Sequence, residues 1–518
     1  MAALAALAAI APRVAEPMTR LDQRLLALAR RRGGAPLLHL GPRMLSGADL
    51  AALVQATVDG WQQQGLGAGS FIGWLGHNSA EMLAMLAACS QSGAVFVPLN
   101  WRLAVPELSA IAQHAGLSAL LNTPECAALA DAVRLAAPDL GPAVPAEPGD
   151  LMLVYTSGTT GQPKGAMHTQ AGMAANIDMA IAVQGLTAAD RVLGVLPLFH
   201  VGGLCIQILP ALALGAPVRL HARFDAAAWL HDLATWRPST SLLVPAVMQA
   251  ILAQPEWPKA NLSSLRFVNA GSQVVPPALI QAFHARGLPV AQVYGSTETG
   301  PVSVALPPEH ALDHAGSAGR PAPGVDVRLV SGRAGQDGTA VDAAPGQVGE
   351  IWLRAPNLMR AYHRQAAGSG FVDGWFATGD LARVDDQGRL WVVGRSKDLI
   401  ISGGENIYPA EIENLAITWP GVAEAAVVGL PDARWGEAAV LALVARADEA
   451  IDLDALRAFF DVQLARFKHP RRIVVVDALP RTALGKVQKP ALAQALAHSL
   501  APALDELPVT AQPARGDG

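Results

Sequence analysis

The chain has 518 residues, of which 51% are hydrophobic and 16% charged, and its formal net charge is -5. This length predicts two or three domains, and the hydrophobic content predicts a full globular fold. The slightly acidic balance excludes a chain-wide basic surface, so a nucleic-acid partner is not expected.

The cysteines and the hydropathy of the sequence bear on its cellular compartment. Cys89, Cys126 and Cys205 are odd in number and lie far apart without metal-ligand spacing, which predicts a reduced compartment, by default the cytoplasm. No stretch has the roughly 20 uninterrupted apolar residues that span a bilayer, so no transmembrane segment is expected. The sequence shows no coiled-coil pattern that would specify an oligomeric state, so a homodimer is neither predicted nor excluded.

Apolar strand and helix patterns alternate over the first three hundred residues. Residues 71–75, 79–89 and 94–98 predict strand, helix and strand, and such a βαβ unit predicts a parallel sheet. The alternation continues in predicted strands at 191–195, 218–220, 241–244 and 265–269 and helices at 201–214 and 226–236. We therefore expect a large, multi-layer α/β domain with parallel-rich sheets.

A loop rich in glycine and hydroxyl groups lies within this pattern at residues 155–165, with the sequence Tyr-Thr-Ser-Gly-Thr-Thr-Gly-Gln-Pro-Lys-Gly. It follows the apolar strand 151–154 and precedes a second short strand at 165–168 and a helix from residue 170, which Thr169 is expected to cap. Glycine amides, hydroxyl donors and Lys164 suit a phosphate group. The spacing differs from a Walker A motif, and a simple hairpin turn is the structural alternative.

From about residue 316 the pattern changes to short strands with turns. Strands at 325–330, 347–354, 381–384 and 390–393 predict a β-rich subdomain, about residues 317–395, within an N-terminal domain of residues 1–395. Residues 396–500 predict a small, mobile α+β domain, with helices at 409–419 and 453–464 and strands at 422–430, 438–444 and 472–476. Residues 501–518 lack periodicity and are expected to form a disordered tail.

Three charged residues stand in segments that suit nucleotide chemistry. Glu298 lies among hydroxyls and glycines in residues 293–300, where one carboxylate suits Mg²⁺, although a surface turn gives the same pattern. Asp380, expected at the start of a strand, can accept hydrogen bonds from both hydroxyls of a ribose, and Arg395 lies just beyond the next hairpin. Lys486 follows a glycine in a loop near the C-terminus, where a solvated lysine is the usual interpretation.

These segments, in this order and spacing, resemble the AMP-forming acyl-CoA synthetases of the adenylate-forming superfamily over about residues 20–495. The resemblance rests on residues 155–165, 196–203, 294–300, 349–362, 374–380, 394–398, 402–413 and 480–486. In such enzymes a carboxylate attacks the α-phosphate of ATP, which releases pyrophosphate and leaves an acyl-adenylate, and a thiol then displaces AMP. The resemblance implies ATP and coenzyme A as co-substrates, Mg²⁺ as cofactor, and an apolar fatty or aromatic acid as substrate.

The resemblance also assigns roles to residues of this chain. It implies a catalytic set of Lys486, Glu298, Thr156 and His200, with Glu298 as the Mg²⁺ ligand and Lys486 bridging the substrate carboxylate and the α-phosphate. The implied phosphate-binding residues are Thr156, Ser157, Gly158, Thr159, Thr160, Gly161 and Lys164. The implied adenine- and ribose-binding residues are Gly271, Ser272, Tyr294, Gly295, Thr297, Asp380 and Arg395.

The second half-reaction requires a conformational change, because a lysine that shields the α-phosphate obstructs an incoming thiol. The resemblance places the hinge at Lys397. It implies coenzyme A contacts at Gly403, Gly404, Trp435, Phe467 and Lys468, and His469 stands where this family often has an arginine.

The acyl pocket implied by the resemblance consists of small or apolar residues together with His200 and Gln273. Without an aspartate, arginine or lysine in its first segment, it argues against an amino acid or a second carboxylate, and it leaves fatty and aromatic acids open. His200 gates the pocket or, alternatively, only packs against aromatic neighbours. The implied members are His200, Val201, Gly202, Gly271, Gln273, Gly300 and Pro301.

Two other functions compete with this one. An enzyme of the same class can transfer its acyl group to a carrier protein instead of coenzyme A. A non-catalytic adenylate-binding paralogue is disfavoured because Glu298, Asp380 and Lys486 are all present.

Overall fold

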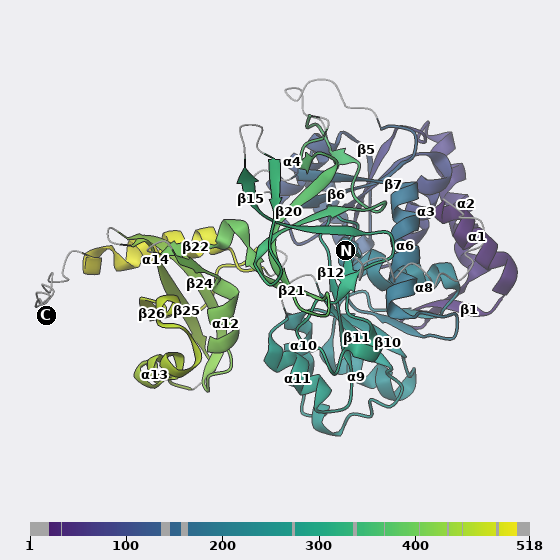
Figure 1. Ribbon diagram of the computed structural model, residues 1–518. Coiled ribbons are helices and arrows are strands. Elements are labelled where there is room, and N and C mark those ends of the chain that lie inside the picture. Colours follow the sequence, from purple (N-terminus) through teal and green to yellow (C-terminus); the bar gives the residue numbers. More distant parts are fainter. Residues whose placement is uncertain are drawn as a thin grey trace, which may run out of the picture. The chain divides into compact units, whose positions relative to one another are not determined.

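The computed structural model divides the chain into two compact units (Figure 1), one formed by Met1–Thr378 with Arg383–Trp391 and the other by Gly379–Ala382 with Val392–Gly518. The predicted boundary after Arg395 therefore lies a few residues beyond the division at Trp391. The segment Gly379–Ala382, which is the middle of one strand, is also grouped with the second unit. The structure describes residues 20–32, 34–135, 146–156, 164–271, 275–334, 339–366, 368–402, 405–432, 435–447, 449–482 and 486–504.

A six-stranded sheet of the first unit carries both ends of the glycine-rich loop. The predicted βαβ unit is confirmed: α3 (Ala80–Ser92) connects two parallel strands, and the Ser79 side chain caps it by accepting a hydrogen bond from the Met82 backbone. The order is β18 (Ala361–Tyr362), β7 (Lys164–Thr169), β6 (Asp150–Thr156), β4 (Val95–Leu99), β3 (Phe71–Leu75) and β5 (Leu117–Asn122).

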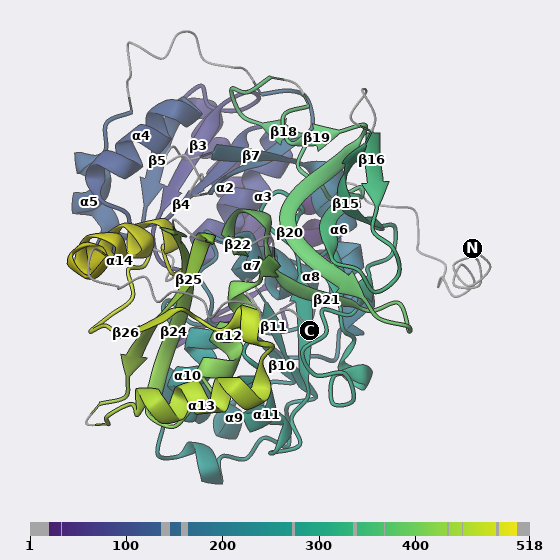
Figure 2. The same cartoon turned by 60° about the vertical axis from the view of Figure 1, so that its left-hand side comes forward.

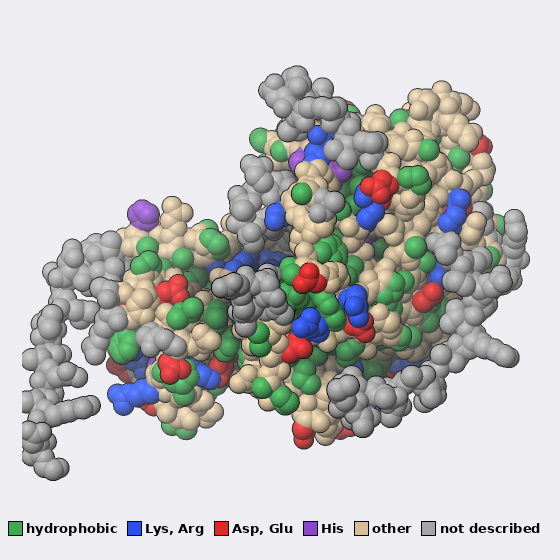
Figure 3. Space-filling model, turned by 45° about the horizontal axis from the view of Figure 1, so that its top comes forward, with side chains coloured by type: hydrophobic (Ala, Val, Ile, Leu, Met, Phe, Trp, Pro, Cys, Tyr) green, Lys and Arg blue, Asp and Glu red, His purple; other side chains and the backbone are tan. Residues whose placement is uncertain are grey.

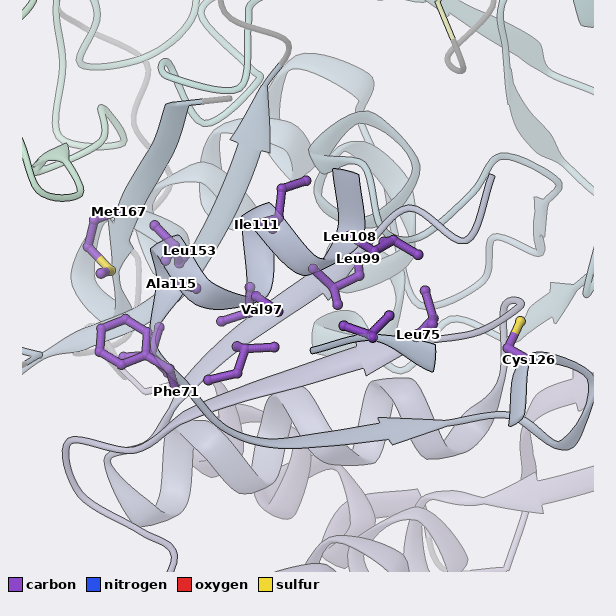
Figure 4. Close-up of a cluster of buried hydrophobic side chains, with 14 residues drawn as sticks. Phe71, Leu75, Val97, Leu99, Leu108, Ile111, Ala115, Cys126, Leu153 and Met167 are labelled. Carbon is purple, nitrogen blue, oxygen red and sulfur yellow. The ribbon is translucent and has the colours of Figure 1, made fainter. Parts of the chain in front are cut away.

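A buried apolar cluster supports the two strands that flank the loop. Figure 4 shows Leu153 of β6 and Met167 of β7 among side chains of β3, β4 and α4 (Val105–Ala115). Leu153, Val97 and Leu108 are all 0% exposed. The loop therefore leaves from and returns to a closely packed base.

A nine-stranded sheet brings the carboxyl ends of parallel strands to one edge. The order is β14 (Arg320–Pro321), β13 (Val304–Ala305), β12 (Val290–Tyr294), β11 (Phe267–Gly271), β10 (Thr240–Leu243), β8 (Val192–Gly194), β9 (Val218–Leu220), β1 (Pro36–Leu40) and β2 (Arg43–Ser46). Strands β8, β9, β10, β11 and β12 pair in parallel. Ligands of open α/β sheets bind beyond such carboxyl ends.

Helices fill the space between these two sheets and cover their outer faces. The long helix α6 (Gln170–Gln184) contacts β7 and α8. The predicted helix at 201–214 is continuous but not uniformly α-helical, because a π-helical turn, Leu204–Ile208, separates α7 (Val201–Gly203) from α8 (Leu209–Leu214). The remaining helices are α1 (Leu21–Arg32), α2 (Gly47–Gln63), α5 (Ala127–Ala132), α9 (Ala226–Thr235), α10 (Pro245–Leu252) and α11 (Pro277–His284).

A third sheet forms the predicted β-rich subdomain. The expectation that Asp380 starts a strand is wrong, because β20 begins at Trp375 and Asp380 lies in its middle. The strands are β16 (Thr339–Asp342), β15 (Asp326–Ala334), β17 (Gly349–Arg354), β20 (Trp375–Val384) and β19 (Phe371–Val372), with β21 (Leu390–Arg395) paired to β20.

The second unit has one mixed sheet with helices packed on it (Figure 2). Its helix α14 continues past residue 501, so the predicted start of the tail is wrong, and residues 505–518 lie outside the described ones. The expected fold class, large α/β with a β-rich subdomain plus small α+β, is confirmed. The elements are β23 (Glu405–Ile407), β22 (Ile400–Ser402), β25 (Gly436–Ala445), β24 (Val422–Asp432), β26 (Arg472–Val475), α12 (Pro409–Ala416), α13 (Leu453–Gln463) and α14 (Lys489–Leu504).

The surface carries both signs of charge. On the face drawn in Figure 3, acidic and basic side chains occur in small neighbouring groups rather than in one extended area of a single sign. Across the described residues, no helix combines the length and apolarity needed to cross a membrane.

Candidate active site

The glycine-rich loop closes an antiparallel hairpin. Thr156 pairs with Lys164 and Tyr155 with Gly165, so two predicted phosphate-binding residues face each other at its open end. The predicted second strand is confirmed, as is the Thr169 cap, whose hydroxyl accepts a hydrogen bond from Gly172 at 3.0 Å. Ser157, Gly158, Thr159, Thr160 and Gly161 lie outside the described residues.

Tyr362 connects the loop lysine to the predicted metal ligand. The Lys164 ammonium lies 5.3 Å from the centre of the Tyr362 ring, and the Tyr362 hydroxyl donates to a Glu298 carboxylate oxygen at 3.0 Å. Burial, and then the negative charge of Glu298, raise the pKa of Tyr362, which keeps the phenol a donor. A cation and a carboxylate that are far apart in sequence therefore share one aromatic neighbour.

Backbone contacts fix the loop that carries Glu298. The Met359 N–H donates to the Glu298 carbonyl at 2.7 Å. A Cβ at Gly300 would lie 2.4 Å from the Asn357 carbonyl oxygen, and a Cβ at Gly295 would lie 2.1 Å from the Pro301 carbonyl oxygen. Both positions thus require glycine because backbone segments touch there.

The donor set around Glu298 fits a magnesium ion. Its half-buried carboxylate uses one oxygen for Tyr362, which leaves the second oxygen for a metal. Among the residues that the structure describes, no group of three or more His, Cys, Asp or Glu side chains is arranged to hold a metal. The Glu298 carboxylate suits magnesium because this ion commonly combines one or two protein carboxylates with water and substrate phosphates.

His168 lies behind the Glu298 loop. It is 1% exposed, it hydrogen-bonds to the backbone of Thr297, and its Nε2 has no partner among the described residues. Burial lowers the pKa of His168 to about 4, which outweighs the opposite effects of Thr297 and Glu298. The imidazole is therefore neutral at physiological pH.

We expect His168 to make the enzyme sensitive to acid. Because its pKa is lowered on folding, its contribution to stability is present above about pH 6.5 and is lost as the pH falls toward 4. Relative to His168→Leu, the wild-type free energy of unfolding should fall by on the order of 3 kcal/mol between pH 7 and pH 4. Urea unfolding of both proteins across this range checks the difference, and parallel curves would contradict it.

Gly271 and Tyr294 end two adjacent parallel strands. Gly271 pairs with Val293, and a Cβ on it would lie 2.5 Å from the Val293 carbonyl oxygen, so this glycine serves strand packing. Gly295 and Thr297 follow Tyr294 in the loop that bears Glu298. The structure thus gathers Gly271, Tyr294, Gly295 and Thr297, four of the predicted adenine-site residues, at one sheet edge, while Ser272 lies outside the described residues.

The predicted acyl-pocket residues come from three segments of the first unit, around residues 200–202, 271–273 and 300–301. His200 is half-buried directly before α7, with its ring 4.5 Å from that of Phe199. The others are buried at Val201, Gly202, Gly271, Gly300 and Pro301. Gln273 lies outside the described residues.

In the second unit, the two predicted ribose ligands form an ion pair. Arg395 Nε lies 2.8 Å from Asp380 Oδ1, and the Ser396 hydroxyl donates to the Gly379 carbonyl at 3.1 Å. Lys397, the predicted hinge, lies in the short 3-10 turn Ser396–Asp398 that follows.

The predicted coenzyme A residues have different partners. Lys468 lies 5.7 Å from the ring of Phe467 and pairs with Glu411 at 2.6 Å. Trp435 instead has the Arg471 guanidinium 4.5 Å from its ring centre. In the family, the position of His469 is often an arginine. Arg471 lies two residues after it. Gly403 and Gly404 lie outside the described residues.

Lys486 ends a short loop of the second unit. Its backbone N–H donates to the Thr482 hydroxyl at 3.2 Å, and its carbonyl accepts from the Thr482 N–H at 2.8 Å. An ion pair between Arg481 and Glu424 ties the loop to β24. The exposed Lys486 side chain therefore extends from an ordered anchor.

Tyr362, His168 and Arg471 were not predicted as site residues. Tyr362 carried a usable signal, since it ends one of the family stretches. His168 and Arg471 carried none, because their neighbours come from distant parts of the chain.

The hairpin strands that end at Thr156 and begin again at Lys164, and the Glu298 carboxylate beyond a parallel sheet edge, fit the AMP-binding enzymes that the motifs predicted. A family model described as "AMP-binding enzyme" matches residues 26–363, and one described as "AMP-binding enzyme C-terminal domain" matches residues 411–486. The chain belongs to this family, as its motifs predicted.

Several relatives extend over nearly the whole chain. An indoleacetate–CoA ligase of Aromatoleum aromaticum is 44% identical over 90% of this chain and 96% of its own. A feruloyl-CoA synthase of an Amycolatopsis species is 40% identical over 91% and 96%. A long-chain-fatty-acid–CoA ligase, FadD13, of Mycobacterium tuberculosis is 33% identical over 86% and 92%.

Solved structures agree with this assignment. The o-succinylbenzoate CoA synthetase of Bacillus subtilis, in complex with its acyl-adenylate, superposes with a TM-score of 0.78 at 30% identity over 90% of this chain and 97% of its own. The same protein has been solved with ATP and a magnesium ion. The predicted class is confirmed: the chain is an AMP-forming acid–CoA ligase that uses ATP, Mg²⁺ and coenzyme A.

Proposed function

We propose that the acid activated by this enzyme is aromatic, so that its product is an aryl-substituted acyl-CoA. The two relatives with the highest of the quoted identities, at 44% and 40%, are named for aromatic acids, whereas the fatty-acid ligase is at 33%. The buried polar side chains in and beside the helical run 201–214 include the neutral amides Asn176 and Gln207, which suits an uncharged ring. The identity gradient is the observation that carries this proposal.

A substrate panel tests the aromatic class. Thioester formation is measured with arylacetic, arylpropenoic and benzoic acids and with saturated acids of C8 to C16. We expect the best aromatic acid to exceed the best saturated acid at least about tenfold in kcat/KM, because a fixed flat site loses contacts with a flexible chain. A saturated acid at the top of the panel would overturn the proposal.

We propose the following residue roles in the first half-reaction. Thr156 and Lys164 hold the β- and γ-phosphates, and Asp380 with Arg395 holds the ribose. Gly271, Tyr294, Gly295 and Thr297 frame the adenine, and Lys486 offsets charge where the carboxylate meets the α-phosphate. Glu298 would hold the magnesium ion, which would supply positive charge to neutralise the phosphates. Support comes from the Lys164–Tyr362–Glu298 contacts and the Asp380–Arg395 pair.

Replacing Glu298 by Gln tests its role as metal ligand. Glutamine can still accept the Tyr362 hydrogen bond but has no charge, so the Mg²⁺ concentration for half-maximal pyrophosphate release should rise at least about tenfold. Glu309→Gln, at an exposed turn of the same unit, is the matched control and should leave the Mg²⁺ dependence unchanged. An unaltered Mg²⁺ requirement in Glu298→Gln would contradict the assignment.

For the second half-reaction we propose that Lys397 is the pivot and that Gly403, Gly404, Trp435, Phe467 and Lys468 meet coenzyme A. The steric conflict at the α-phosphate supports this division, since the lysine needed in the first step obstructs the thiol in the second. Free coenzyme A as acceptor is tested against a phosphopantetheinylated carrier protein, and a clear preference for the carrier would overturn that choice.

We further propose a cytoplasmic location and leave open a homodimer. The three cysteines are free and buried in the structure, which suits a reducing compartment. Fractionation of the source cells that found the protein outside the cytoplasm would refute the location. Sedimentation distinguishes the 53.8 kDa chain from a particle of twice that mass.

A further inference from the structure

A cluster of buried amide side chains lies next to the π-helical turn of the first unit. It joins Gln184 at the end of α6, Gln207 in the π-helical turn and Asn269 in β11, which are 2%, 1% and 0% exposed. Thr240 of β10 completes it. Turns of π-helix inside α-helices often mark functional sites, because they shift side chains out of the regular helical register.

The hydrogen bonds of this cluster fix the orientation of each amide. The Gln184 Nε2 donates to the carbonyls of Ala180 at 2.9 Å and Ile206 at 2.8 Å, so its Oε1 must face the other side. That oxygen accepts from Gln207 Nε2 at 3.1 Å and from Asn269 Nδ2. Gln207 Nε2 also donates to the Thr240 hydroxyl at 2.9 Å. Flipping any of the three amides would place like groups against each other.

Two acceptors are left over as a result. Gln207 Oε1 and Asn269 Oδ1 are both buried, and neither meets a donor among the described residues. A buried acceptor without a donor destabilises a fold, so a site that retains two of them in one network is organised to receive N–H or O–H groups.

The cluster belongs to the segments that carry the proposed acyl pocket. Asn269 lies two residues before Gly271 and therefore on the same face of β11. Gln207 lies seven residues, about two helical turns, along the run that begins after His200. His200 directly precedes α7, and Gly271 ends β11. Gln207 lies further along the helical run, and Asn269 lies earlier in the strand.

We propose that Gln207 and Asn269 form the end of the acyl site that contacts the substrate ring. There they select aromatic acids that carry an N–H or O–H donor on the ring. This inference rests on the aromatic substrate class proposed above. The pair accepts hydrogen bonds only, so it discriminates against rings that offer an ether oxygen or a bare C–H at the same place. A site built to bind such a donor rejects analogues that lack it, because its own polar atoms then stay unpaired.

Matched substrate pairs test the proposal. The pairs are indole-3-acetic acid with benzofuran-3-acetic acid, and 4-hydroxyphenylpropenoic acid with phenylpropenoic acid. For at least one pair we expect the wild-type enzyme to favour the donor-bearing acid by about 10- to 100-fold in kcat/KM. In Gln207→Met and Asn269→Leu that ratio should fall to about threefold or less. Each ratio is measured within one preparation, so it does not depend on the fraction of folded enzyme.

The control is Ser241→Ala, which removes a fully buried hydroxyl beside Thr240 that already donates to the Leu193 carbonyl at 2.8 Å. It should leave the donor preference intact. Equal rates for both members of each pair in the wild type, or a preference that survives both variants, would show that the acceptors bind only internal water and would overturn the inference. Poor turnover of all four aromatic acids beside good turnover of fatty acids would instead refute the aromatic class.

Discussion

Lys486→Ala should lose adenylate formation by about 10²- to 10³-fold, roughly 3 to 4 kcal/mol of transition-state stabilisation, while still converting supplied acyl-adenylate and coenzyme A into thioester. In the first step two anions, the substrate carboxylate and the α-phosphate, must approach each other while further charge develops. A preorganised ammonium offsets that repulsion. The second step releases AMP and has no such requirement.

The fold of the Lys486 segment should survive this substitution. Its hydrogen bonds with Thr482 use backbone atoms of Lys486, which alanine also provides. Pyrophosphate release reports the first half-reaction, and thioester formation from synthetic acyl-adenylate reports the second. Lys489→Ala removes a nearby cation that pairs with Glu413 at 2.7 Å and should spare both rates. Equal losses in both half-reactions of Lys486→Ala would refute the division of labour.

Lys397→Pro should have the reverse effect, with adenylate formation retained and the thioester step slowed by on the order of 10²-fold. Proline fixes φ near the value typical of a 3-10 turn and restricts the preceding residue, so rotation about this segment is hindered. The turn is closed by a hydrogen bond from the Leu399 N–H to the Ser396 carbonyl at 3.4 Å, which does not use the Lys397 N–H. Proline should therefore be tolerated in this conformation.

Lys397→Ala separates the effect of charge from that of rotation. It removes the ammonium but leaves the backbone free, so both half-reactions should proceed near the wild-type rates. A wild-type thioester rate in Lys397→Pro, or a slow one in Lys397→Ala, would show that the pivot lies elsewhere.

Local pattern was sufficient for much of the fold. The hairpin of β6 and β7, the Thr169 cap and the β24–β25 pair follow from apolar runs, turn residues and capping side chains, which act over a few residues. The helices α1, α2 and α14 were not predicted. The alanine-rich segment of α14 has weak apolar periodicity, so packing rather than pattern determines that helix.

The family and the reaction were readable from the sequence because catalytic motifs are contiguous and tolerate little change in spacing. The surroundings of those motifs were not readable. Strand β18 adds Tyr362 to the edge of β7, although the two segments are almost two hundred residues apart, and only that pairing places a phenol between Lys164 and Glu298. The same holds for His168, whose pKa is lowered by burial that only the folded chain provides.

The glycine-rich loop, Glu298, Asp380 and Lys486 could thus be named from sequence alone, since each is part of a short motif with its own chemistry. The tertiary structure decided which groups stand beside them. Gln184, Gln207 and Asn269 look like ordinary polar residues in apolar segments, and only the packing of α6, the π-helical turn and β11 orients their amides and leaves two acceptors without donors. Hydrogen-bond satisfaction depends on atoms brought together by folding, so no local pattern can report it.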